Sequence, residues 1–180
     1  MTSVLAGWCV GPHVIAMLGL SVAGLVAGAG MASSIELGEL QRDGAWVFTE
    51  RSEGRDGPRK YMAATPAAES GDVWLLLACD AARMTASVMF STAPEYTVRS
   101  PAQLVLQSGG FPVVSVAAQV VHRTQISIDA ETTRHLMPLF FDSASIVVSV
   151  RDAIGAAHAY TFSLQSGGRA LAPIERVCAH

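Results

Sequence analysis

Residues 73–90 of the sequence, VWLLLACDAARMTASVMF, decide the fold class of the chain. The apolar rows of the first half are Val73, Leu75, Leu77 and Cys79 on one side, and Trp74, Leu76 and Ala78 on the other. Successive strand side chains point to opposite faces, so two apolar rows predict a central strand covered on both sides. After a turn at 80–82, Met84, Ala86, Val88 and Phe90 alternate with polar residues. The stretch therefore predicts a hairpin at the centre of an antiparallel sheet.

Short segments of strand character continue on both sides of this hairpin, separated by turns that contain Gly and Pro. They cover residues 46–51, 60–64, 104–106, 114–120, 126–128, 146–150 and 160–164. Strands at this spacing are typical of antiparallel sandwiches and barrels. The sequence thus predicts a mainly β fold: a single antiparallel β-sandwich or partly open barrel with one or two short helices, after an N-terminal hydrophobic helix.

Two segments have helical spacing instead. In residues 131–141, apolar side chains recur at helical intervals, and Pro138 is expected to kink or end that helix. Residues 170–177 predict a short terminal helix in which Pro173 is tolerable only in the first turn. Asp129 and Glu131 precede or open the first helix, where acidic groups favour the helix dipole.

The N-terminal segment has no Lys, Arg, Asp or Glu before Glu36, and residues 14–32 are apolar or small apart from Ser21. A signal-peptide core needs about 7–15 apolar residues and a membrane-spanning helix about 20, so the segment fits either. Small residues just before Ser33 supply a cleavage site. We expect a leader or membrane anchor at 1–32 and a β-sandwich domain at 33–180.

This N-terminal segment predicts a periplasmic or secreted location for the protein. The region before His13 lacks the usual Lys or Arg, which leaves a start at Met17 or an uncleaved inner-membrane anchor as alternatives. In the anchored form, contact with the membrane is expected only through residues 14–32. The net charge of −3 and the absence of a basic cluster argue against a nucleic-acid partner.

Cysteine usage agrees with export. Cys9 lies in the N-terminal segment, and the domain keeps the pair Cys79 and Cys178. An even pair in an exported domain predicts one disulfide, with two unrelated buried thiols as the alternative. Cys178 follows Leu171 and Ile174 at helical spacing, so both sulfurs are expected to face the core.

One combination of segments resembles a known family. The segments that carry the resemblance are Trp46, residues 75–79 ending in Cys79, a strand at 96–99, a helix followed by a strand at 136–150, residues 160–164, and residues 170–178 ending in Cys178. This combination resembles the TagO/VasI-type periplasmic proteins associated with type VI secretion. The invasion-associated locus B proteins, also exported and β-rich, have a similar end. The resemblance implies a signal peptide, a β-sandwich and a secretion-associated role.

The motifs of common catalytic chemistry are missing from the sequence. There is no Gly-x-Ser-x-Gly elbow, and Ser108 and Ser166 precede Gly-Gly pairs as ordinary turn residues. No His and Cys spacing predicts a metal ligand set, and no glycine pattern predicts a phosphate loop. We predict no catalytic residue, no metal site and no cofactor.

Aromatic and cationic side chains supply the remaining candidates. Tyr96 and Arg99 are the predicted interaction residues, because an Arg beside a Tyr is a common interface anchor; a solvated strand end is the alternative. Trp46, Trp74, Tyr96 and Tyr160 could line a binding face, with core packing the favoured role of Trp74.

The sequence therefore predicts a non-enzymatic accessory or interaction module of the bacterial cell envelope that binds an envelope protein. One alternative is a periplasmic protein that binds a small ligand or a cell-wall fragment. Another is a hydrolase whose site is built from dispersed residues such as His122, Asp129 and His135. A convergent polar cluster would favour either alternative, and a flat face with an exposed Tyr or Arg would favour the module.

Overall fold

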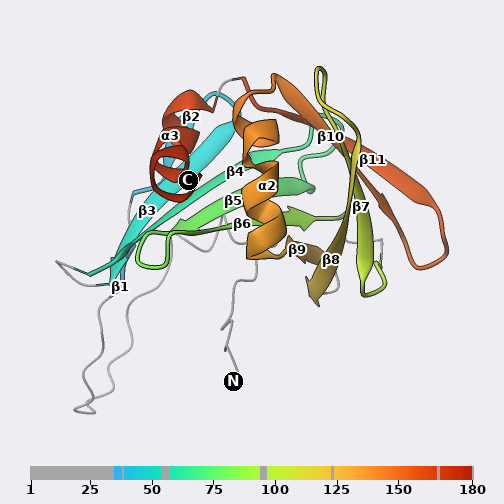
Figure 1. The fold of residues 1–180 in the computed structure, drawn as a ribbon, viewed down its shortest axis with the longest axis horizontal. Helices are drawn as coiled ribbons and strands as arrows, with labels where there is room; N and C mark the ends of the chain where they lie inside the picture. Colours follow the sequence, from blue (N-terminus) through green and yellow to red (C-terminus); the bar gives the residue numbers. More distant parts are fainter. Residues whose placement is uncertain are drawn as a thin grey trace, which may run out of the picture. The chain divides into compact units, whose positions relative to one another are not determined.

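The hairpin at residues 73–90 forms β5 (Trp74–Asp80) and β6 (Thr85–Ser91), which pair antiparallel at the centre of the sheet in the computed structural model (Figure 1). The structure describes residues 35–37, 39–53, 57–93, 97–122, 124–165 and 167–179. The predicted leader or anchor at 1–32 lies outside these residues. Among the residues described, no helix is long and apolar enough to cross a membrane.

The sheet is open and antiparallel throughout, in the order β1-β3-β4-β5-β6-β9-β8-β7-β10-β11, with β2 added to β3. The other strands are β1 (Ile35–Leu37), β2 (Gln41–Asp43), β3 (Trp46–Glu53), β4 (Arg59–Pro66), β7 (Ala102–Gln107), β8 (Val114–His122), β9 (Gln125–Ile128), β10 (Ser145–Arg151) and β11 (Ala157–Ser163). The mainly β, antiparallel fold predicted from the sequence is confirmed. β1 and β2 had not been expected, since each is only a short pairing on β3.

Alternation along the strands gives the sheet an inner and an outer face. One inner row runs Phe48, Ala63, Leu77 and Val88 across β3 to β6. The ring of Phe90 on the same face lies 5.8 Å from that of Tyr160 and 5.9 Å from that of Phe162, measured between centroids. The inner face therefore forms the core that joins β5 and β6 to β11.

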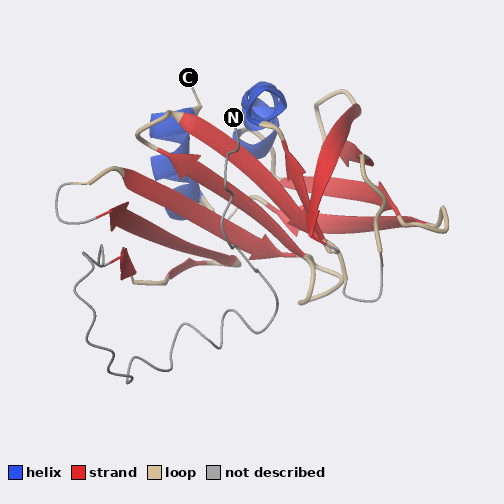
Figure 2. Cartoon of the chain, turned by 90° about the horizontal axis from the view of Figure 1, so that it is seen from below, coloured by secondary structure: helices blue, strands red, loops and turns tan. Residues whose placement is uncertain are grey.

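Both helices pack on the inner face (Figure 2). α2 (Ala130–Phe141) buries Leu136, Met137, Leu139 and Phe140 there. Asp129 caps its start, since Oδ1 accepts the backbone N–H of Thr132 at 2.9 Å. The helix continues past Pro138 to Phe141, so of the two effects expected of Pro138, a kink or an end of the helix, the end does not occur. A proline removes one donor and crowds the preceding turn, yet the buried apolar face holds the helix together.

α3 (Gly168–Cys178) starts earlier than the sequence suggested. Pro173 consequently lies beyond the first turn, which corrects the expected position. The helix begins beside the buried indole of Trp46, whose Nε1 donates to the carbonyl of Ser163 at 3.1 Å. Trp46 thus belongs to the core and joins the start of β3 to the end of β11.

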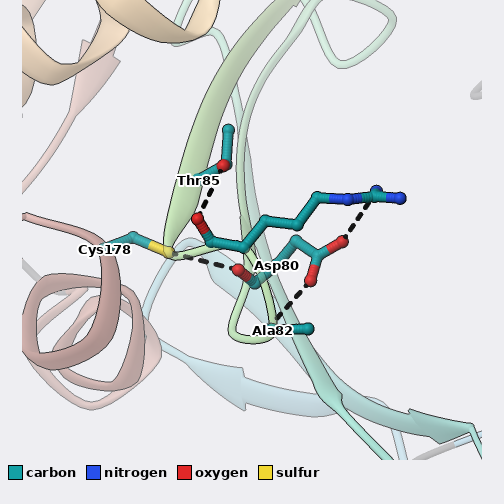
Figure 3. A network of polar contacts seen from close by, with 5 residues as sticks. Asp80, Ala82, Thr85 and Cys178 are labelled. Carbon is teal, nitrogen blue, oxygen red and sulfur yellow. Dashed lines mark hydrogen bonds and ion pairs between the residues drawn. The ribbon is translucent and has the colours of Figure 1, made fainter. Parts of the chain in front are cut away.

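Cys178, the last residue of α3, reaches Cys79 on β5. The two sulfurs lie at the disulfide distance of 2.04 Å and the Cα atoms are 6.0 Å apart. Figure 3 shows Cys178 beside the β5–β6 turn, with its Sγ 4.0 Å from the carbonyl oxygen of Asp80. As the sequence predicts, both sulfurs face the core and are buried.

The Asp80 side chain closes the turn next to this disulfide. Its Oδ1 accepts the backbone N–H of Ala82 at 3.0 Å, and its Oδ2 pairs with Arg83 at 3.2 Å (Figure 3). Met84 was expected in line with the inward residues of β6, but it is a turn residue with φ of 48° and is 65% exposed. The strand begins one residue later, at Thr85.

Trp74 also departs from expectation. It lies half-buried on the outer face of β5 and takes no part in the core. The two apolar rows of β5 are equivalent in sequence, but the helices and the disulfide cover only the row that contains Leu75, Leu77 and Cys79. The prediction that Trp74 packs in the core is therefore wrong.

Candidate interaction site at the β10–β11 hairpin

The loop that joins β10 to β11 is organised by one carboxylate. Oδ1 of Asp152 accepts the backbone N–H groups of Ile154 at 3.0 Å and of Ala156 at 2.9 Å. The backbone N–H of Asp152 also donates to the carbonyl of Ala156 at 2.9 Å, and Gly155 takes the left-handed conformation that closes the turn, with φ of 91°. Asp in this position commonly bonds the backbone a few residues ahead. The loop is therefore held in one shape.

The second oxygen of the same carboxylate binds His158 on β11. His158 Nε2 lies 2.8 Å from Asp152 Oδ2, and the side chains are 18% and 8% exposed. An ionised carboxylate only accepts, so Nε2 is the donor. The hydrogen bond from His158 is the main cause that lowers the pKa of Asp152; desolvation opposes it, and the N–H groups of Ala156 and Ile154 add to it.

This fixed loop displays an apolar side chain. Ile154 is 90% exposed, more than any other large apolar residue among those described. A single exposed apolar residue is common on protein surfaces. Here, however, the side chain stands on a backbone already immobilised by Asp152, so contact with a partner orders little further chain.

The segment before the cis Ser100–Pro101 bond lies against the loop. The carbonyl of Thr97 accepts the backbone N–H of Ala153 at 2.7 Å, which brings Arg99 to the same end of the molecule. Arg99 is exposed, as expected, but residues 97–99 do not form the strand that was predicted. Tyr96, its predicted companion, lies outside the described residues.

β11 forms one edge of the sheet, and half of that edge is covered. The backbone N–H of Thr161 donates to Oε2 of Glu69 at 2.8 Å, and its carbonyl accepts the N–H of Ala68 at 2.8 Å. The carbonyl of Ser163 is bonded to Trp46. Through these contacts the end of β11 meets the chain leaving β4.

The other half of the edge is open. Backbone groups alternate in direction along a strand, so Ala157 and Ala159 point their N–H and C=O groups the same way as Thr161, away from β10. Within the described ranges, no hydrogen-bond partner lies on that side of either alanine. Both residues are exposed, and their methyl groups leave the edge accessible.

Cations surround this open edge. Arg151, at the end of β10, pairs in register with Ala157 and is exposed; its Nη1 donates to the carbonyl of Gly155 at 3.2 Å. Arg99 forms no ion pair with any residue that the structure describes. The Asp152 side chain is only 8% exposed, so the exposed charges beside the open half of the edge are those of Arg99 and Arg151.

The alternative catalytic set is not brought together. His122 pairs with Gln125 at the start of β9, whereas Asp129 follows the other end of that strand, about 13 Å away along an extended chain. His135 lies further along α2, exposed. In the part of the chain that the structure describes, no three His, Cys, Asp or Glu side chains are grouped to hold a metal ion.

Other sequence candidates have structural positions. Ser108 is buried and donates to the carbonyl of Ser145 at 2.8 Å, and Ser166 lies outside the described residues. Tyr160 is 7% exposed in the core, so it lines no binding face. The pair of Asp152 and His158 was not predicted from the sequence. Its turn had a signature, because an Asp followed three residues later by a Gly is typical of a turn.

Comparisons of the chain with protein-family models, with curated proteins and with solved structures find no match.

Proposed function

We propose that this protein is a non-enzymatic interaction module of the bacterial cell envelope that binds an extended segment of a partner protein along the open half of β11. The observation that carries the proposal is the unpaired edge at Ala157 and Ala159 beside a loop locked by Asp152. The partner segment would extend the sheet by one antiparallel or parallel strand, a common mode of peptide recognition.

The edge lacks the features that proteins use to block such pairing. Exposed edges are usually protected by charges, prolines, bulges or covering loops. In β11 the second half is covered by Glu69 and Ala68, whereas the outward backbone groups of the open half belong to Ala157 and Ala159, whose side chains are methyl groups. Each backbone hydrogen bond contributes about 1 kcal/mol net, so the few available here give a weak contact unless side chains add to it.

Side chains beside the edge supply the additional affinity, and their chemistry indicates which kind of partner segment fits. Ile154 offers an apolar anchor that is already fixed, and Arg99 and Arg151 offer cations. Charge complementarity therefore favours a segment with acidic residues next to an apolar one. An anchor of this kind typically contributes most of the affinity of a small interface.

The envelope location rests on sequence chemistry. The uncharged segment before Glu36 supports export, and the Cys79–Cys178 pair suits an oxidising compartment. The resemblance to TagO/VasI-type proteins supports a secretion-associated role. Intact mass of the protein recovered from the envelope should correspond to a chain that begins at Ser33; a full-length chain found only in the cytoplasm would contradict export.

The binding mode is tested by photo-crosslinking in cells. The full chain carries benzoylphenylalanine in place of Ile154, and we expect an adduct whose partner peptide contains an acidic residue. Ala159→Pro removes the outward N–H and is tolerated at an edge strand, so it should abolish the adduct. Ala159→Val keeps the donor and should retain the adduct.

The same crosslinker at exposed Met84, in the β5–β6 turn, is the positional control. Equal yields of the same adduct at the two positions would contradict the proposal. So would an adduct that persists in Ala159→Pro while circular dichroism shows the fold intact.

A further inference from the structure

The open half of β11 ends where a short loop covers the strand. Both outward backbone groups of Thr161 are occupied: its N–H donates to Oε2 of Glu69 at 2.8 Å, and its carbonyl accepts the N–H of Ala68 at 2.8 Å. The two contacts take the place of the pair of hydrogen bonds that a residue of a neighbouring antiparallel strand would make. A strand that pairs with Ala157 and Ala159 must therefore end before Thr161.

The loop that provides this end is the short connection between β4 and β5. The backbone N–H of Ala67 donates to the carbonyl of Val73 at 2.8 Å and closes the loop at its base. Within it, the backbone N–H of Asp72 donates to Oγ of Ser70 at 3.3 Å. Glu69 is therefore presented from a closed loop, at a defined place beside the edge.

The charge at this end of the open half is negative. Glu69 and Asp72 are both exposed. Two cations, Arg42 and Arg169, lie around the start of β3, and Asp43 accompanies them: it follows Arg42 on β2, and its Oδ2 accepts the backbone N–H of Arg169 at 2.8 Å. Three carboxylates thus accompany two guanidinium groups, and the two carboxylates of the loop come without a cation of their own loop.

The charge at the opposite end is positive, because the exposed charges there are those of Arg99 and Arg151. The two ends are separated by the four steps from Ala157 to Thr161, which is about 14 Å along an extended strand. Charges screen one another over about 8 Å at physiological salt, so the two ends attract different groups of a bound segment.

We propose that the partner segment pairs antiparallel to β11 and carries a basic residue before its paired residues and an acidic residue after them. This inference rests on the proposed function, because it concerns the segment that pairs with the open half. Every pair of strands that the structure describes is antiparallel, and antiparallel pairing is slightly more stable per residue than parallel pairing.

Direction then fixes the order of the charges. β11 runs from the Arg151 end toward Glu69, so an antiparallel segment begins beside Glu69 and ends beside Arg151 and Ile154. A carboxylate has about four acceptor positions, so Glu69 can bind a lysine of the partner while it still holds the N–H of Thr161. Complementary charges at the two ends select both the direction and the register of the segment.

The test uses two capped synthetic peptides, acetyl-Lys-Thr-Val-Thr-Val-Glu-amide and the same peptide with Lys and Glu exchanged. Titrated into the full chain, the first should shift the amide NMR signals of Ala157 and Ala159 with an affinity about fivefold higher than the second. The preference should disappear in about 1 M NaCl. Glu69→Gln keeps an acceptor for Thr161 but removes the charge and should reduce the preference, whereas Glu131→Gln, on exposed α2 surface, should leave it unchanged.

A nitroxide at the N-terminus of the first peptide reports the direction. It should broaden the amide signals of Ala68 and Glu69 more than that of Ile154. Stronger broadening at Ile154 would overturn the antiparallel direction. Equal affinities of the two peptides would overturn the charge order and leave edge binding standing, whereas the absence of any shift at Ala157 and Ala159 with either peptide would overturn this inference and the proposed function together.

Discussion

Gly167 shows how closely single residues are fitted in this core. A Cβ built on Gly167 would lie 2.7 Å from Nε1 of Trp46 and 2.9 Å from two of its ring carbons. The indole cannot move aside easily, because it is fully buried and bonded to Ser163. Gly168, the next residue, has nothing within 4 Å of such an atom. Gly168 is therefore a suitable control position for a substitution at Gly167.

The prediction at this scale compares alanine at the two positions. Gly167→Ala should lower the free energy of unfolding by about 1–3 kcal/mol, because overpacking forces the indole or the start of α3 to shift. Gly168→Ala lies within the helix and should be neutral or raise stability by up to about 1 kcal/mol, since alanine favours helix over glycine. Urea denaturation measures both; equal effects would contradict the close contact with Trp46.

The shape of the β10–β11 hairpin depends on the ionisation of Asp152. The pKa of Asp152 is lowered in the folded chain by the hydrogen bond from His158. The folded state therefore holds this proton less strongly than the unfolded state does. Its stabilising effect is complete above the ordinary aspartate pKa of about 3.9 and is lost as the pH falls through the lowered value.

Asp152→Asn should accordingly lower the urea midpoint at pH 7, and the gap to wild type should close as the solution is acidified below about pH 4. Amide exchange at Ile154 and Ala156 should become about tenfold faster at neutral pH, because the loop loses its fixed acceptor. In a His158→Gln background the effect of Asp152→Asn should shrink, since the principal partner is already missing. A gap that stays constant with pH would contradict the role of the ionised pair.

Acid sensitivity of the edge has a second source. Burial raises the pKa of Glu69, but its hydrogen bonds to Thr161 outweigh this and lower the pKa overall. Its protonation would weaken the bond to the N–H of Thr161 that covers the second half of β11. The length of open edge on this strand should therefore increase in acid.

At the scale of the whole molecule, the disulfide joins residues 99 positions apart and holds α3 on β5. Closing a loop on the order of 100 residues is worth up to roughly 4.7 kcal/mol in the chain-entropy model. The bond lies at the last residue of α3, whose other buried residues are Ala170, Leu171 and Ile174. Its loss therefore affects both the unfolded chain and the attachment of the final helix.

Replacing both cysteines by alanine should lower the free energy of unfolding by about 2–5 kcal/mol. Amide exchange should accelerate first in the last turn of α3 and much less in β10, which packs elsewhere. Reduced wild-type protein is the control and should match the variant. Identical stability of oxidised and reduced protein would contradict a stabilising bond.

The sheet could be predicted to the extent that its signals are local. Alternation along 73–90 identifies the residues of β5 and β6 that face the core, and the positions of most strands follow from the same periodicity. The face of the sheet on which Trp74 lies could not be predicted, because both rows of β5 are apolar and only the distant α3 distinguishes them. Strand order could not be predicted either, since β6 pairs with β9 and β7 with β10 across long stretches of chain.

The candidate site was predicted only in part. Arg99 is exposed at the proposed surface, as the sequence suggests, but its neighbours come from a loop more than fifty positions later. The bond between Thr97 and Ala153 depends on tertiary folding and leaves no periodic trace. The turn signature at 152–155 was available, whereas its pairing with His158 required the register of β11.

The position of α3 also bears on when this domain can fold. α3 comes after every strand in chain order, yet it covers the inner face of the central strands and begins beside Trp46, near the first of the long strands. The core around β5 is therefore incomplete until residues 168–178 have been synthesised and can reach it. Holding α3 away from the sheet should thus delay folding of the whole domain, including strands synthesised about a hundred residues earlier.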